Sequence, residues 1–268
     1  MTTKLPLELE SYRSQLESSK RNFVKITTEK VKDTTFTESK IGGYPFLPKG
    51  FSYPKDKDDK YLEFLAQINF AELPKNDIYP ESGILQFFIG FEDLYGADLD
   101  FDTIQEGYRV LFHDSVGGEV ETNFDFLDKE RVEDLTPLLH KNTLKMYFKN
   151  SSEYVSASSY EFEKYFEDSF YGFFERFEDK EDEIADFYYE NIDNAGHKLG
   201  GYANFTQDDP RSFSENFGKE YNLLFQLDSD ADFDDICWGD AGIGNFFIKK
   251  EDLVNRDFSK VIFNWDCS

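Results

Sequence analysis

The order of apolar and polar residues predicts a chain built mainly of short strands. Residues 22–30 alternate, with Val24, Ile26 and Thr28 on one face, which is typical of a half-buried strand. Further apolar runs predict strands at 62–70, 83–91 and 108–113. The stretch between the first two strands, GGYPFLPKGFSYP (42–54), predicts a loop because its prolines and glycines disfavour regular structure.

Two segments have helical spacing instead. Near the N-terminus, Leu5, Leu9, Tyr12 and Leu16 form an apolar stripe that predicts a short helix. A longer stripe of aromatic residues predicts a helix in the middle of the chain, preceded by Ser158 and Glu161 as a capping box. The stripe consists of Phe162, Phe166, Phe170, Phe173 and Phe177. We expect these rings to be packed core, and residues 120–196 to be an α-rich insertion or linker.

Several blocks of the sequence occur twice in the same order. KIGGYP (40–45) matches KLGGYA (198–203), and FLAQIN (64–69) matches LLFQLD (223–228), which pairs Gln67 with Gln226. GILQFFIGFEDL (83–94) and GIGNFFIKKEDL (242–253) are identical at most positions, and VLFHD (110–114) resembles VIFNWD (261–266). Four matching blocks predict an internal duplication.

The predicted fold is α+β, with a β-rich duplication at its centre. Two half-units of mainly antiparallel strands, related by a pseudo-twofold axis, would cover each other's apolar faces, with helices flanking them. We expect one domain over 1–268. It would consist of a first half-repeat with the N-terminal helix at 1–119, the α-rich insertion at 120–196 and a second half-repeat at 197–268. The junction of the halves is the expected place for a cleft.

The same blocks resemble a known family. SKIGGYPFLPKGFSYP, LAQINF, ESGILQFF, LLFQLDSD and WGDAGIGNFFI together are similar to the YwqG-like family of bacterial proteins, a domain-of-unknown-function family. The resemblance extends from about residue 22 to 266. It implies a soluble bacterial protein of mixed α+β type, and it implies no established activity or catalytic residue.

Composition narrows the possible partners. The 30 Phe and 16 Tyr residues predict an aromatic core, and the net charge of −26 argues against nucleic-acid and anionic-membrane binding. The charge leaves a basic protein partner or a cation open, or simply keeps an aromatic-rich chain soluble. No apolar run is long enough for a bilayer, and the N-terminal residues lack the apolar segment of a signal peptide. We therefore expect a cytoplasmic protein with Cys237 and Cys267 reduced.

Two kinds of repeated residue are candidates for a binding site. Each Gly-Gly pair either offers backbone N–H groups to an anion or supplies the positive φ of a turn. Gln67 and Gln226 lie in apolar strands, so each amide must bond to backbone, to its counterpart, to water or to a ligand. The residues that we predict to bind a ligand are Tyr44, Gln67, Tyr202, Gln226, Asp228, Trp238 and Asp240.

The acidic stretch DSDADFDD (228–235) is a candidate for a divalent cation. It begins like a calcium loop, but Phe233 and Gly239 stand where an EF-hand requires Gly and Glu. Asp228, Asp230 and Asp240 are the candidate ligands. The alternative is that these short side chains cap turns in the loop.

Three functions fit these observations. The first is a non-catalytic binding module with a small molecule or peptide in the cleft between the halves, since no metal motif such as HExxH and no activated nucleophile are evident. The second is an acidic protein that neutralises a basic, toxin-like partner. The third is a metal-assisted hydrolase that uses the acids of 228–240. No cofactor other than a divalent cation is indicated.

Overall fold

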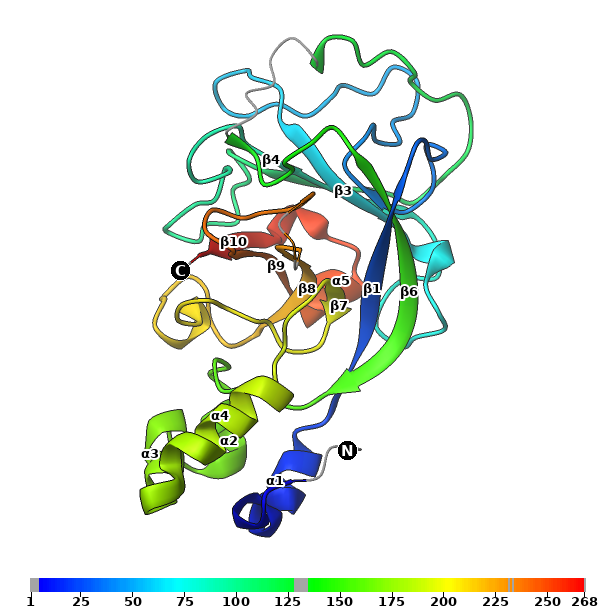
Figure 1. Ribbon diagram of the computed structural model, residues 1–268. Coiled ribbons are helices and arrows are strands. Elements are labelled where there is room, and N and C mark those ends of the chain that lie inside the picture. Colours follow the sequence, from blue (N-terminus) through cyan, green and yellow to red (C-terminus); the bar gives the residue numbers. More distant parts are fainter. Residues whose placement is uncertain (1–4, 128–134, 231, 233, 268) are drawn as a thin grey trace.

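The computed structural model describes residues 5–127, 135–230, 232 and 234–267. Its centre is a curled ten-stranded sheet in which neighbouring strands are antiparallel (Figure 1). The strands are β1 (Arg21–Val31), β2 (Lys40–Ile41), β3 (Glu63–Asn69), β4 (Ile84–Ile89), β5 (Arg109–His113), β6 (Thr143–Glu153), β7 (Lys198–Gly200), β8 (Tyr221–Asp228), β9 (Ile243–Lys249) and β10 (Ile262–Asp266). The strands predicted at 22–30, 62–70, 83–91 and 108–113 are confirmed as β1, β3, β4 and β5.

The strand order is β10-β9-β8-β7-β1-β6-β2-β3-β4-β5. The long strands β1 and β6 pair with each other from Arg21 opposite Glu153 to Val31 opposite Thr143. We call β2–β5, which extend from β6, the first arm, and β7–β10, which extend from β1, the second arm. The arms therefore do not pair edge to edge, because β1 and β6 lie between them.

The arms have matching registers. Lys40 of β2 lies opposite Gln67 of β3, and Lys198 of β7 lies opposite Gln226 of β8. Both β3 and β8 show a register shift shortly before the glutamine. Each glutamine also lies opposite an amide side chain on the next strand of its arm. Gln67 lies opposite Gln86 of β4, and Gln226 lies opposite Asn245 of β9.

The curl of the sheet brings the two arms together face to face. The ring centroid of Phe87 in β4 lies 4.8 Å from that of Phe225 in β8 and 4.6 Å from that of Phe246 in β9. All three rings are fully buried. Aromatic contacts of this kind contribute beyond the area that they bury, so they explain why an aromatic-rich sequence closes such a sheet on itself.

The described residues also form five helices, four of which lie together at one end of the molecule. They are α1 (Arg13–Ser18), α2 (Phe162–Phe166), α3 (Phe170–Glu175), α4 (Glu181–Asn191) and α5 (Lys250–Val254). Helices α1 to α4 lie together below the sheet in Figure 1, where Leu9, Leu16, Phe162, Phe173 and Tyr188 belong to one buried cluster. Phe162, Phe166 and Phe173 of the aromatic stripe are thus packed core, as predicted, and Phe177 packs against them, while the side chain of Phe170 lies outside the described part of the chain. Among the described residues, no helix has the length and apolarity needed to cross a membrane.

Two details of the predicted central helix are wrong. The stripe does not form one helix, because Glu167 takes a left-handed conformation (φ 57°) and ends α2, and Ser169 caps a separate α3 through Gly172 N–H. The capping box is also wrong, because the Glu161 carboxylate accepts two hydrogen bonds from the Arg21 guanidinium, at 2.8 and 2.7 Å. Residues 120–196 also contain a sheet strand, β6, between Thr143 and Glu153.

Candidate functional site

Gln67 is completely buried in β3, and its amide bonds to the chain on both sides of β2. Its Oε1 accepts hydrogen bonds from Phe46 N–H at 2.9 Å and from Gln86 Nε2 at 3.1 Å. Its Nε2 donates to the carbonyl oxygens of Phe36 at 2.7 Å and Glu38 at 2.8 Å. The amide thus has its full set of partners, and its role in this structure is to fix the loop around β2.

Gln226 does the same in the second arm. It is also completely buried, and its Oε1 accepts from Asn204 N–H at 2.8 Å. Its Nε2 donates to the carbonyl oxygens of Asn194 at 2.9 Å and Gly196 at 2.8 Å. Both glutamines are therefore bonded to backbone on the two sides of the neighbouring short strand. They support loops, and neither is among the residues that line the two cavities described below.

The two Gly-Gly pairs turn the chain beside these loops. Gly42 and Gly43 have φ of 66° and 72°, and Gly200 and Gly201 have φ of 69° and 79°, which confirms the turn interpretation. The second glycine of each pair also lies close to a side-chain oxygen from a central strand. A Cβ at Gly43 would lie 2.5 Å from Thr143 Oγ1, and one at Gly201 would lie 2.1 Å from an oxygen of Glu153.

In the second arm, a carboxylate of the protein fills the space beside this turn. Glu153 Oε2 lies 2.9 Å from the ammonium of Lys198, and Glu153 Oε1 accepts from Tyr202 N–H at 2.6 Å. The two side chains are 9% and 1% exposed. Burial raises the pKa of Glu153 and lowers the pKa of Lys198, while the attraction between them opposes both shifts.

In the first arm, the equivalent lysine has no such partner. Lys40 is 2% exposed, and its ammonium donates to Thr34 Oγ1 at 3.1 Å and to Thr35 O at 2.9 Å. No described carboxylate lies within ion-pair distance of it. Burial lowers the pKa of Lys40 to about 8, although Glu38 and Glu72 favour its charged form.

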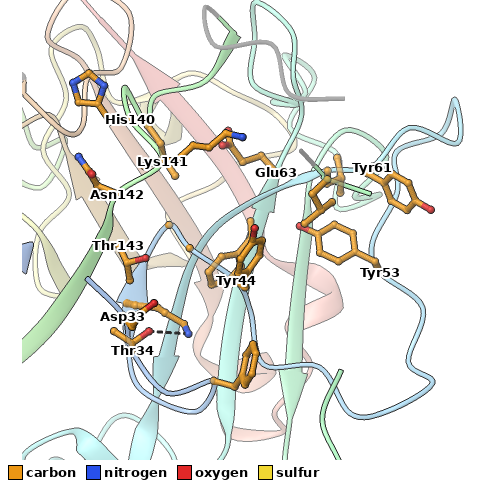
Figure 2. A pocket seen from close by; sticks show the side chains of 18 of the residues that line it. Asp33, Thr34, Tyr44, Tyr53, Tyr61, Glu63, His140, Lys141, Asn142 and Thr143 are labelled. Atoms are coloured by element: carbon orange, nitrogen blue, oxygen red, sulfur yellow. Dashed lines mark hydrogen bonds between the residues drawn. The ribbon is translucent and has the colours of Figure 1, made fainter. Parts of the chain in front are cut away.

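Lys40 lines a cavity of about 340 Å³. Figure 2 shows Tyr53 and Tyr61 at one end of this cavity, Asn142 and Thr143 at the other, and Tyr44 between them. The dashed line in the figure is the hydrogen bond from the Lys40 ammonium to Thr34. The lining residues all lie between 32 and 143, so the cavity belongs to the first arm and the start of β6 and not to the junction of the arms.

Two kinds of side chain line the cavity. The aromatic ones are Phe36, Tyr44, Tyr53, Tyr61, Phe64 and Phe91. The polar ones include Lys32, Asp33, Thr34, Lys40, Glu63, His140, Lys141, Asn142 and Thr143. Tyr44 is 43% exposed, and its ring stacks on Phe124 at a centroid distance of 5.0 Å. A pocket of this size, with an apolar wall and a few convergent polar groups, suits a small organic molecule.

The structure separates the predicted site residues of the second half from this cavity. Tyr202 is 2% exposed, its hydroxyl donates to Ser19 O at 2.6 Å, and the Arg21 guanidinium lies 3.8 Å from the centre of its ring. Trp238 is completely buried in the core, against Tyr95. Of the seven residues predicted to bind a ligand, Tyr44 lines the cavity and Gln67 supports its loop.

In the acidic loop after β8, Asp230 bonds to the backbone of the loop itself. Asp230 accepts from the N–H groups of Asp234, Asp235 and Ile236 at 2.8 to 3.1 Å, which is the turn-capping alternative. Asp228 accepts from Gly196 N–H at 2.6 Å, and burial raises its pKa. Asp240 is exposed. Within the described ranges, no group of three His, Cys, Asp or Glu side chains is arranged to hold a metal ion.

Sequence reasoning missed Lys40, Thr143 and the pair Tyr53 and Tyr61. Lys40 carries a signal in the sequence, since a lysine stands two residues before the Gly-Gly pair in both repeated blocks. Thr143 has no such signal, because only the pairing of β2 with β6 brings it beside Gly43.

Residues 39–267 match the family described as "Domain of unknown function (DUF1963)". Comparison with curated proteins gives no match. The family match supports the expectation of an uncharacterised domain family, and the narrower YwqG-like assignment remains a prediction.

Proposed function

The chain belongs to the DUF1963 family, a domain family of unknown function, and we propose that it is a binding module whose cavity takes a small, negatively charged ligand. The observation that carries the proposal is the buried Lys40 ammonium on the wall of a 340 Å³ cavity. A buried charge without a counter-charge is costly, and an anionic ligand offsets that cost. The aromatic wall supplies contact area for the rest of the ligand.

This proposal moves the ligand from the place that the sequence predicted. We expected a cleft between the halves, lined by Gln67 and Gln226. Those amides are bonded to backbone, and the cavity is lined by residues of 32–143 alone. The first Gly-Gly turn remains part of the proposed binding site, because Gly42, Gly43 and Tyr44 line the cavity.

We also infer that the two arms are copies of one ancestral unit, related by a pseudo-twofold axis between β1 and β6. The support is the repeated sequence blocks together with the equivalent hydrogen bonds of Gln67 and Gln226. In this interpretation, one copy encloses its own carboxylate, Glu153, and the other copy has an open cavity at the same place.

The binding proposal is tested by screening small organic acids, amines and neutral compounds for changes in amide chemical shift. Anions should shift the signals of residues 40–44 and 140–143, and Lys40→Met should abolish these shifts. Lys149→Met, which removes a charge from an exposed part of β6, is the matched control and should bind like the wild type. If no compound class shifts these residues, or if Lys40→Met binds anions as well as the control, the proposal is wrong.

The net charge favours a second candidate function, the binding of a basic protein partner. Such a complex depends on attraction between exposed charges, so its dissociation constant should rise steeply between 0.05 and 0.5 M salt. A ligand held by a buried lysine is screened much less. Titration of a candidate basic protein across this range separates the two functions.

A further inference from the structure

The central strands show which residue of the first arm corresponds to Glu153. Lys25 of β1 lies opposite Lys198, and Lys145 of β6 lies opposite Lys40, so Lys25 and Lys145 hold equivalent positions. Glu153 follows Lys145 at the same interval at which Asp33 follows Lys25. Asp33 is therefore the positional counterpart of Glu153.

Asp33 does not pair with a buried lysine as Glu153 does. Strand β6 continues to Glu153, so this side chain is held beside the turn of the second arm. Strand β1 ends at Val31, before Asp33 is reached. Asp33 is exposed and makes no hydrogen bond or ion pair with any described residue. Asp33 thus does not supply to the first arm the lysine-paired carboxylate that Glu153 supplies to the second.

The groups that would surround such a carboxylate are nevertheless present. The Lys40 ammonium is the counterpart of the Lys198 ammonium, and Tyr44 N–H is the counterpart of Tyr202 N–H, which bonds to Glu153. Tyr44 N–H has no hydrogen-bond partner among the described residues. Thr143 Oγ1 lies against Gly43, on the side where Glu153 lies against Gly201.

We propose that the first-arm cavity binds a carboxylate group of the ligand between Lys40 Nζ and Tyr44 N–H, in the place that Glu153 occupies in the second arm. This inference rests on the proposed function and specifies the ligand's chemical class. A carboxylate accepts charge-assisted hydrogen bonds from an ammonium and an amide N–H, which are the two donors that Glu153 uses. The Thr143 hydroxyl can rotate to donate a third.

The rest of the ligand is predicted to be apolar and flat. Phe36, Tyr44, Tyr53, Tyr61 and Phe64 provide ring faces and edges around the remaining space. A second, more open groove lined by Leu47, Phe51, Phe124 and Phe126 also includes Tyr53 and Tyr61, so a longer ligand has room to extend beyond the cavity. Both a free aromatic acid and the C-terminal carboxylate of a peptide have this chemistry, and the test below distinguishes them.

The direct test uses matched probes at pH 7. The first pair is N-acetyl-phenylalanine and its C-terminal amide, and the second pair is a heptapeptide ending in phenylalanine with a free or amidated C-terminus. Calorimetric titration should give at least tenfold tighter binding of the free acid in one or both pairs. This preference should be lost in Lys40→Met and kept in Lys149→Met. Preference in the first pair alone identifies a small acid, and tighter binding of the free peptide than of N-acetyl-phenylalanine identifies a peptide terminus.

Three outcomes have different consequences. If acid and amide bind the cavity equally, the carboxylate inference is overturned, and the proposed preference for an anion stands only if another kind of anion shifts residues 40–44 and Lys40→Met abolishes that shift. If none of the four probes binds up to 10 mM while another kind of anion shifts residues 40–44, the inference is likewise wrong and the function survives. If no anion of any kind binds, both are wrong.

The second arm offers an independent test of the comparison between the arms. Glu153→Ala should open an equivalent space beside Lys198, and acetate should then raise the Tm of this variant in a saturable way. Acetamide should have no such effect, and neither should acetate on Glu153→Ala/Lys198→Met. Absence of an acetate effect on a folded Glu153→Ala protein would contradict the comparison. If that variant does not fold, the Lys40→Met titrations decide the inference alone.

Discussion

The ammonium nitrogen of Lys198 lies 2.9 Å from a carboxylate oxygen of Glu153, with both side chains almost completely buried. Lys40, at the equivalent place in the other arm, is equally buried and has hydrogen bonds to Thr34 and Thr35 in place of a carboxylate. The two arms thus hold a lysine at matching registers in two electrostatic environments. Because the local backbone is shared, variants of the two lysines can be compared directly.

Lys198→Met should destabilise the protein far more than Lys40→Met. Removing Lys198 leaves the Glu153 carboxylate buried without its cation, which typically costs about 3–5 kcal/mol. Removing Lys40 eliminates a buried charge that has no counter-ion, so the free energy of unfolding should fall by less than about 1 kcal/mol or should rise. Urea unfolding of the two variants and the wild type measures both values. Equal losses would mean that Lys40 has a compensating partner.

The stability that Lys40 contributes should depend on pH between about 8 and 10.5. Its pKa is about 8 in the folded protein and 10.5 as the ordinary value, so the unfolded chain binds the extra proton throughout this window. Stability of the wild type relative to Lys40→Met should therefore rise with pH across the window, by roughly 3 kcal/mol in total, and should stay constant below pH 8. Other titrating groups cancel in the difference between the two proteins. A flat difference would contradict the prediction.

Binding of a carboxylate ligand should weaken above pH 8. The ligand pairs with the protonated lysine, so the dissociation constant should rise about tenfold from pH 7 to pH 9, where a carboxylic acid itself does not titrate. Lys149→Met should show the same profile. The other charged or titratable groups near Lys40 are Lys32, Asp33, Glu38, Glu63, Glu72, His140, Lys141 and Lys145. A constant affinity from pH 7 to 9 would show that the Lys40 ammonium does not bind the ligand.

Gln67→Met and Gln226→Met should both destabilise the protein, but only the first should weaken ligand binding. Each substitution leaves one backbone N–H and two carbonyl groups without their partner, at about 1–3 kcal/mol for each group that stays unsatisfied. The loop that Gln67 holds carries Lys40 and Tyr44, whereas the loop that Gln226 holds lies outside the cavity. Thermal unfolding and probe titration test the two parts. A binding loss in both variants would indicate a general loss of structure.

Much of the sheet follows from local pattern. The alternation at 22–30 and the apolar runs around Gln67 and Gln86 identify β1, β3 and β4, because strands with buried faces leave a clear periodicity. The prediction of core packing is confirmed for Phe162, Phe166 and Phe173, and the prediction of one continuous helix is wrong. Its break comes from the left-handed Glu167, a residue with no glycine-like signal. Strand β6 was missed because polar residues occupy its second half.

By itself, the sequence determined the features that act over a few residues of chain or are repeated in it: glycines where the backbone needs positive φ, and a glutamine in each apolar strand. It did not determine what lies beside each repeated lysine. Glu153 meets Lys198, while the equivalent position on β1 lies beyond the end of the strand. Only the pairing of β1 and β6 with the short strands of the two arms brings these distant residues together. A partner's charge can be read from the sequence, but its position is fixed by sheet register and by where a strand ends.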